Sequence, residues 1–220
     1  GLGVDPPPAF TERMKTAFHE RCGCSFEDVP YLLFLSRIDE KKGVDLLVKA
    51  YTNRLKDADD KDDARPALPK LVIAGPGLDS AYGRKIQRLA AKANQSQHAV
   101  IFPGMLLDDA KWGAFYGCEA FILPSHQENF GIAVVEALAC GKPVLIADQV
   151  NIWREIQRAG AGYVSENTLD GTIQLLRSWE QTDATQRQTL SRNAKAIYKK
   201  AFSPEPATKR LLHAISETLL

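Results

Sequence analysis

The chain has 220 residues, of which 45% are hydrophobic, 25% charged and 8% aromatic. A globular chain of this length buries roughly 70% of its unfolded surface, and the composition excludes intrinsic disorder, collagen and coiled coil. The 28 Lys and Arg residues against 27 Asp and Glu give a formal net charge of +1. Non-specific attraction to nucleic acid or to an anionic membrane is therefore excluded, and any anionic ligand must be held by a local site.

The four cysteines lack the paired spacing of a metal site and the density of a secreted disulfide scaffold; they are Cys22, Cys24, Cys118 and Cys140. We expect structural or incidental thiols and no metal site. The N-terminus lacks the basic and apolar regions of a signal peptide, and no apolar run is long enough to cross a bilayer. The expected location is the cytoplasm, in soluble form, which still allows action at a membrane surface.

Five short apolar runs predict strands at residues 31–35, 71–74, 100–102, 120–123 and 143–146. Amphipathic stretches at helical spacing separate them, and this alternation is typical of βαβ units. Both faces of such a sheet are covered, which explains why the runs are continuously apolar. We therefore predict an α/β fold: one Rossmann-like parallel sheet with helices on both faces.

Helices are predicted wherever apolar residues recur at spacings of three and four. The expected segments are 44–55, 82–93, a short helix over 109–116 capped by Asp108, an apolar helix over 132–139, and three later helices near 169–176, 190–201 and 211–219. No strand signal follows Tyr163 and Val164, so the tail is predicted to be helical. The acidic stretch 56–69 has almost no apolar residues and is predicted to be a mobile surface loop.

Candidate ligand-binding residues directly follow the strands, because ligands of an open parallel sheet bind outside the carboxyl ends of its strands. After the first strand come Arg37, Lys42 and Gly43. A guanidinium can bind two oxygens of a diphosphate, an ammonium adds a point charge, and glycine admits close backbone approach. Taken alone, this loop would more simply be a solvated charged turn.

Glycines follow the second and third strands, at Gly75-Pro76-Gly77 and at Gly104-Met105. Glycine lets the main chain pass close to a ligand, although it also simply closes turns. The first of these segments is not the GxGxxG fingerprint, and no acidic residue ends the second strand at the ribose-binding position. A nicotinamide-dependent dehydrogenase is therefore disfavoured.

The densest group of polar residues follows the fourth strand and leads into a helix. Free N–H groups near Gly131 and Ile132, together with the helix dipole, predict an anion site. Glu136 lies about one turn inside an otherwise apolar helix, where a carboxylate needs a partner: either ligand hydroxyls or a basic side chain such as that of Lys142.

Glu128 precedes Glu136 by eight residues, or about 12 Å if the segment is helical. Paired glycosidase carboxylates lie closer, at roughly 5 to 9.5 Å. Unless the loop folds back, the two glutamates therefore serve different ends of an elongated ligand. For His126, exposure on the loop and contact with a ligand are equally compatible with the sequence.

These residues resemble the EX7E motif of the group 1 retaining glycosyltransferases, which have the GT-B fold. The motif-bearing segments are Pro124-Ser125, Glu128-Asn129-Phe130-Gly131 and Glu136 to Val144, supported by Arg37, Lys42-Gly43, Gly75-Pro76-Gly77 and Gly104. The resemblance covers about residues 31 to 165. It implies two facing Rossmann-like domains, of which this chain is the C-terminal, donor-binding half.

The start of the chain, Gly3-Val4-Asp5, resembles the end of the family's interdomain linker. The resemblance thus implies that residues 1–30 are a remnant of the linker with an N-terminal helix. Residues 31–220 would be the nucleotide-sugar-binding domain with its C-terminal helices. The missing partner would be an N-terminal acceptor domain.

The resemblance also implies a role for each matching residue. Arg37 and Lys42 would grip the donor diphosphate and stabilise the departing nucleoside diphosphate. Glu128 would contact hydroxyls of the donor sugar, and Glu136 those of the ribose. The other nucleotide-binding residues would be Gly75, Gly104 and Met105, the last two against the base, with Asn129, Phe130, Gly131 and Ile132 at the helix start. Ser36 stands where the family usually has glycine. Its side chain leaves less room for a phosphate to approach the backbone at this position.

The implied reaction transfers a hexosyl unit, with retention, from a UDP-, GDP- or ADP-sugar to a glycan, lipid or small-molecule acceptor. The implied enzyme needs no metal or other cofactor and no nucleic acid, and membrane contact would be peripheral, through the missing domain. The chain as given is expected to bind nucleotide weakly and to transfer nothing. A non-catalytic nucleotide-sugar-binding module stays open, as does a GT-B-type epimerase or phosphorylase, which the EX7E spacing disfavours.

Overall fold

A computed structural model describes residues 3–59, 68–97 and 99–208 of the chain. Within them, six parallel strands form one sheet in the order β3-β2-β1-β4-β5-β6. The strands are β1 (Tyr31–Leu35), β2 (Lys70–Ala74), β3 (Val100–Gly104), β4 (Ala120–Leu123), β5 (Val144–Ala147) and β6 (Gly162–Ser165). The predicted α/β fold with a parallel sheet is confirmed.

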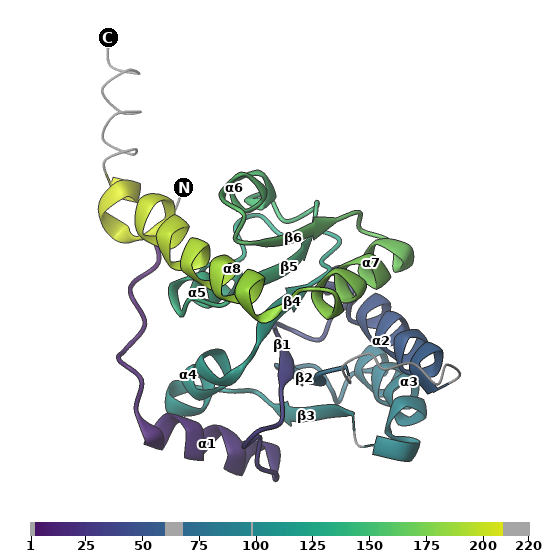
Figure 1. The fold of residues 1–220 in the computed structure, drawn as a ribbon. Helices are drawn as coiled ribbons and strands as arrows, with labels where there is room; N and C mark the ends of the chain where they lie inside the picture. Colours follow the sequence, from purple (N-terminus) through teal and green to yellow (C-terminus); the bar gives the residue numbers. More distant parts are fainter. Residues whose placement is uncertain (1–2, 60–67, 98, 209–220) are drawn as a thin grey trace.

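Helices cover both faces of the sheet (Figure 1). They are α1 (Glu12–Cys22), α2 (Val44–Asp59), α3 (Ala81–Gln97), α4 (Asp108–Gly117), α5 (Ile132–Ala139), α6 (Trp153–Ala159), α7 (Leu169–Glu180) and α8 (Ala184–Ile197), with a short 3-10 helix at Glu40–Lys42 and a π-helical turn at Tyr198–Phe202. On one face α2 packs against α3 and α7, while on the other α1 packs against α4 and α8 packs against α5 and α6.

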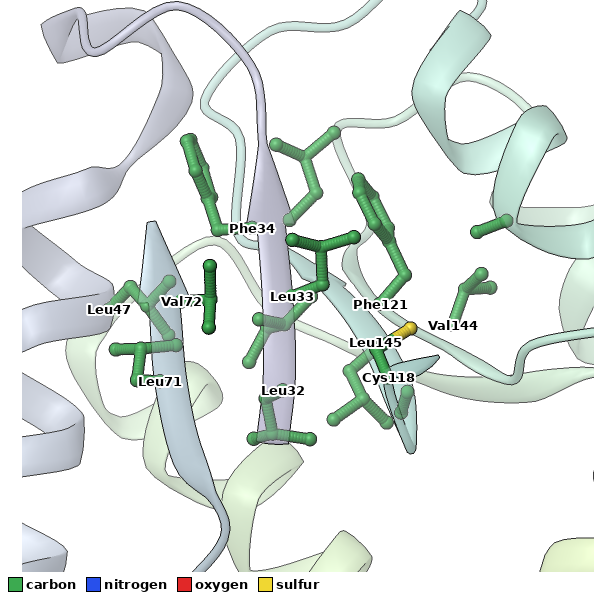
Figure 2. Close-up of a cluster of buried hydrophobic side chains, with 14 of the residues drawn as sticks. Leu32, Leu33, Phe34, Leu47, Leu71, Val72, Cys118, Phe121, Val144 and Leu145 are labelled. Carbon is green, nitrogen blue, oxygen red and sulfur yellow. The ribbon is translucent and has the colours of Figure 1, made fainter. Parts of the chain in front are cut away.

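The core lies between these two helical layers and is built from the predicted apolar runs. Figure 2 shows Leu33 and Phe34 of β1 between Val72 of β2 and Phe121 of β4, with Leu47 of α2 packing from the side. All five side chains are fully buried. Burial of both sheet faces explains why these strands carry continuous apolar runs, after Lys70 in β2, instead of alternating apolar and polar residues.

The strand order reverses between β1 and β4. From β1 the chain first adds β2 and β3 on one side and then crosses over to add β4, β5 and β6 on the other. At the crossover Leu32 pairs with Ala120 and Leu33 with Phe121. The helices that follow β1 and β4 therefore cover opposite faces of the sheet, and the carboxyl edge at such a reversal is where open α/β sheets bind ligands.

Two neighbouring elements in the last third of the chain, α6 and β6, were not predicted. β6 has four half-buried residues at the edge of the sheet, so it lacks the continuous apolar run of the inner strands. α6 has only seven residues and buries only Ile156 among them, which leaves no periodic pattern to recognise.

Several predicted boundaries need correction. α2 continues to Asp59, so the predicted loop at 56–69 begins too early; residues 60–67 lie outside the described residues, as does the helix predicted at 211–219. Asp108 does not cap α4, because the helix begins at Asp108 itself and the capping position falls to Leu107, which makes no side-chain cap bond. Near 190–201 the structure has α8 from Ala184, capped by Asp183, followed by the π-helical turn.

The segment before α1 runs from the end of α8 to the opposite end of the molecule (Figure 1). At its start the Val4 N–H donates to the Phe202 carbonyl at 2.9 Å, and the Tyr198 hydroxyl donates to the Val4 carbonyl at 2.9 Å. At its end the Tyr116 hydroxyl donates to the Pro8 carbonyl at 2.7 Å. Both ends of this extended segment are thus fixed to the domain.

The four cysteines are all free. Burial raises the pKa of the Cys22 and Cys140 thiols to about 12 and that of Cys118 to about 11. Thiols with such pKa values stay protonated at neutral pH, which agrees with the expected structural role. Among the helices described, none has the length and apolar character needed to span a membrane.

Candidate functional site

The loops after β1 and β4 meet at the point where the strand order reverses. The Ser125 hydroxyl donates to the Lys41 carbonyl at 2.9 Å, and the His126 N–H donates to the same carbonyl at 2.8 Å. The Lys42 ammonium lies 2.5 Å from a carboxylate oxygen of Glu128. Three of the residues chosen from the sequence therefore lie on two joined loops: Arg37 and Lys42 on one, and Glu128 on the other.

Gly43 makes this close approach possible. It ends the 3-10 helix Glu40–Lys42 in the left-handed conformation, with φ 66°. A Cβ atom at this position would lie 2.0 Å from the carbonyl oxygen of Pro124. Any larger residue would push the two loops apart, so a glycine is needed at this position for the two loops to contact each other.

The Lys42–Glu128 pair is largely shielded from water, with side chains 12% and 20% exposed. An ammonium has three donors, so Lys42 can bond Glu128 and still offer N–H groups to an anion. The backbone of Glu128 is fixed as well: its N–H donates to the Gln149 carbonyl at 3.1 Å, and its carbonyl accepts from the Asn151 N–H at 3.0 Å. The loop after β5 thus holds the Glu128 backbone in place.

Arg37 is exposed and lines a cavity of about 540 Å³ between the loops after β1 and β2. Lys41, Gly77 and Tyr82 also line it. His126 is exposed and lines a neighbouring cavity of about 370 Å³ together with Lys41 and Tyr82. Burial raises the pKa of the Tyr82 phenol, which therefore acts there as a neutral hydroxyl.

The start of α5 points its free amides toward the same edge. Gly131 takes the left-handed conformation with φ 70°, and its carbonyl accepts the first helical bond from the Val135 N–H at 3.1 Å. Asn129 and Ile132 are exposed, whereas Phe130 packs edge-on against the ring of Phe202 at 6.1 Å between centroids. The first N–H groups of the helix have no carbonyl of their own helix to bond.

Glu136 pairs with Lys111 of α4, and not with Lys142 as one reading of the sequence suggested. The Lys111 ammonium lies 2.6 Å from Glu136 Oε1. It also lies 4.6 Å from the centre of the Trp112 ring. The two glutamates therefore pair with different lysines on different elements, which agrees with separate tasks for them.

The glycines after β2 and β3 join the strand ends to each other. The Gly75 N–H donates to the Gly104 carbonyl at 2.8 Å, and a Cβ on buried Gly75 would lie 1.8 Å from the Ser36 carbonyl oxygen. Gly75 thus has a packing role, and its contact with a ligand stays a prediction. Met105 is 52% exposed, and the Arg21 guanidinium of α1 donates to its carbonyl at 3.1 Å.

Sequence reasoning missed several residues that shape this edge: Lys111, Arg21, Gln149 and Asn151. Lys111 and Glu136 are 25 positions apart, and Arg21 and Met105 are 84 apart. No local spacing links such residues, and two of the contacts are made by backbone atoms. Only the folded arrangement reveals them.

An all-parallel sheet of this order, with polar loops gathered where the strand order reverses, defines a Rossmann-like α/β domain of the GT-B type. Residues 23–197 match the family described as "Glycosyl transferases group 1". The chain therefore belongs to this family, and the resemblance stated from the sequence is confirmed.

Curated relatives include D-inositol 3-phosphate glycosyltransferases. That of Geodermatophilus obscurus is 32% identical over 158 residues, which are 66% of this chain and 34% of the relative. That of Stackebrandtia nassauensis is 34% identical over 146 residues, which are 66% of this chain and 32% of the relative. The matched part thus spans about a third of these relatives.

Solved structures show the same fold over nearly the whole chain. Anabaena Alr3699/HepE, solved in complex with UDP and glucose, matches with a TM-score of 0.76 and 17% identity over 98% of this chain and 55% of that one. A glycosyltransferase from Rickettsia africae matches with a TM-score of 0.77 and 18% identity over 99% and 56%. The chain corresponds to about half of such GT-B structures.

Proposed function

We propose that this chain is the donor-binding domain of a retaining glycosyltransferase that moves a hexosyl unit from a nucleoside-diphosphate sugar to an acceptor. Membership of the group 1 glycosyltransferases supports the reaction class. The observation that carries the proposal is the Lys42–Glu128 pair, which joins the loops after β1 and β4 at the reversal of strand order. A cation for the diphosphate and a carboxylate for the sugar thus lie side by side.

In this proposal the leaving diphosphate is stabilised by cations and amides. Arg37 and Lys42 approach it from the loop after β1, and the N–H groups of Gly131 and Ile132 approach from the start of α5. These groups are fixed before the reaction, so they can stabilise negative charge as it develops on the leaving group. The proposed enzyme needs no metal, because these donors supply the positive potential.

The remaining groups bind the two ends of the donor. Glu128 accepts hydrogen bonds from sugar hydroxyls, and Glu136 accepts them from ribose hydroxyls. Gly104 and Met105 lie beside the base. The separate lysine partners of the two glutamates support this division, because each carboxylate is held by a different element.

The proposal divides the chain into a linker with a helix, residues 1–30, and a donor domain, residues 31–220. Acceptor-binding groups belong to a further domain, so the chain alone binds nucleotide and transfers nothing. In the complete enzyme the partners are the donor and an acceptor that is a glycan, a lipid or a small molecule.

Calorimetric titration of UDP, GDP and ADP into the folded chain tests the proposal. We expect one of them to bind, and its nucleoside to bind more weakly because it lacks the charge that Arg37 and Lys42 recognise. A folded chain that binds none of the three at millimolar concentration would contradict the proposal. Binding without transfer, after an acceptor domain is restored, would identify a non-catalytic module instead.

A further inference from the structure

Lys111 connects two helices whose first turns lie at the carboxyl edge of the sheet. α4 follows β3 and α5 follows β4, and the Lys111 ammonium of α4 lies 2.6 Å from Glu136 Oε1 of α5. The two side chains are 24% and 12% exposed. The Trp112 ring, 4.6 Å from the same ammonium, restricts where the lysine can move.

The pair lies one turn below exposed apolar side chains. Leu107 and Ile132 precede Lys111 and Glu136 by four residues each, so each shares a helix face with its partner below. Leu107 is 57% exposed and Ile132 is 56% exposed. Exposed apolar side chains thus lie one turn away from each member of the pair, toward the carboxyl edge of the sheet.

Lys111 occupies only one side of the carboxylate. It bonds Oε1, and Oε2 accepts no hydrogen bond from any residue in the described part of the chain. Among the described residues Oε2 is not a buried atom without a partner, so its acceptor sites are open to solvent. A ligand with hydroxyl groups bound at this edge would supply donors to Oε2 in place of water.

We propose that Lys111 is a positioning residue for ribose recognition: it orients the Glu136 carboxylate so that Oε2 receives the ribose hydroxyls. This inference rests on the proposed function, in which Glu136 binds ribose. Lys111 acts through Glu136, with no contact of its own to the diphosphate. Removing it should weaken recognition of the ribose while leaving recognition of the phosphates intact.

The test compares a ribonucleotide with its deoxy form. UDP, GDP and ADP are titrated into the wild-type chain, and the tightest binder is compared with its 2′-deoxy counterpart. We expect the wild type to prefer the ribonucleotide about tenfold, the size of one good hydrogen bond to a charged group. In Lys111→Met the preference should fall to about twofold, and Lys111→Arg should restore most of it.

A double-substitution cycle shows whether Lys111 acts through Glu136. In a Glu136→Ala background, Lys111→Met should cause no further loss of affinity. Lys15→Met is the matched control, because it breaks the Lys15–Glu27 pair of α1 and the loop before β1, outside the site. Thermal melting verifies that each variant is folded, and Lys111→Gln replaces Lys111→Met if the latter does not fold.

The outcomes separate the inference from the proposed function. A wild type that binds a nucleotide and prefers ribose, with the preference retained in Lys111→Met, would overturn the inference alone. The inference would also be overturned if Lys111→Met weakened the affinity for the ribo and deoxy forms equally and did so in the Glu136→Ala background as well. That result would place Lys111 against the base or the phosphate. A folded wild type that binds no nucleotide would refute the proposed function itself.

Discussion

Glu128 shares Lys42 with the proposed diphosphate, so removing the charge of Glu128 should strengthen the binding of a nucleoside diphosphate. Glu128→Gln keeps the size of the side chain and removes its negative charge. The carboxylate oxygen lies 2.5 Å from the Lys42 ammonium. A phosphate oxygen bonded to another N–H of the same ammonium at about 2.8 Å would lie roughly 4 Å from that carboxylate.

Two like charges about 4 Å apart repel by about 1 kcal/mol in bulk water and by about 4 kcal/mol at an effective dielectric constant of about 20. We therefore expect Glu128→Gln to bind the nucleoside diphosphate at least about fivefold more tightly, the factor that the bulk-water value gives. The affinity for the corresponding nucleotide sugar should increase less, because the sugar hydroxyls lose the carboxylate as a hydrogen-bond acceptor. The affinity ratio of nucleotide sugar to nucleoside diphosphate should fall accordingly.

Isothermal titration calorimetry measures both affinities for the wild type and the variant. Glu27→Gln serves as the control, since Glu27 pairs with Lys15 on the surface away from the site and should change neither affinity. If Glu128→Gln lowered the affinities for the nucleoside diphosphate and for the nucleotide sugar by the same factor, Glu128 would not lie next to the sugar and this prediction would be wrong.

Three further predictions concern other parts of the domain. Arg37→Ala should lower the affinity for a nucleoside diphosphate about tenfold in titrations and leave the affinity for the nucleoside unchanged. Equal losses of affinity would show that Arg37 does not contact the phosphate. Gly43→Ala should lower the free energy of unfolding in urea by about 2 to 4 kcal/mol, because its Cβ would overlap the Pro124 carbonyl. Gly23→Ala, at the same φ of 66° with open space around it, should cost only about 1 kcal/mol, and equal costs would contradict this account. Burial, aided by a nearby lysine, lowers the pKa of His19, so its protonation favours the unfolded chain and stability declines as pH falls below about 6.5. His19→Gln should reduce that decline between pH 7.5 and 5, and an unchanged slope would exclude His19 as its source.

The inner sheet could be predicted from the sequence because its strands are buried on both faces. Continuous apolar runs mark β1, β2, β4 and β5, and each lies within a residue or two of its predicted bounds. β6 was not predicted because an edge strand of four half-buried residues has no continuous apolar run. Its place in the sheet comes from pairing with β5, a contact that no local pattern encodes.

The candidate site was partly predictable for a similar reason. A parallel sheet brings the residues after its strands to one edge, and this places Arg37, Lys42 and Glu128 on neighbouring loops. The partners of the glutamates were not predictable: Lys42 and Glu128 are 86 positions apart, and Glu136 pairs with Lys111 and not with Lys142, the basic residue named as an alternative to ligand hydroxyls. Such pairs depend on how helices and loops pack across the sheet.

The central claim is that a diphosphate binds between the loops after β1 and β4. Crystals of the chain soaked separately with UDP, GDP and ADP test it most directly. The account predicts density for the diphosphate within hydrogen-bond distance of Arg37, Lys42 and the first amides of α5, with the ribose beside Glu136. A nucleotide bound at well-ordered density elsewhere, with these residues untouched, would contradict it.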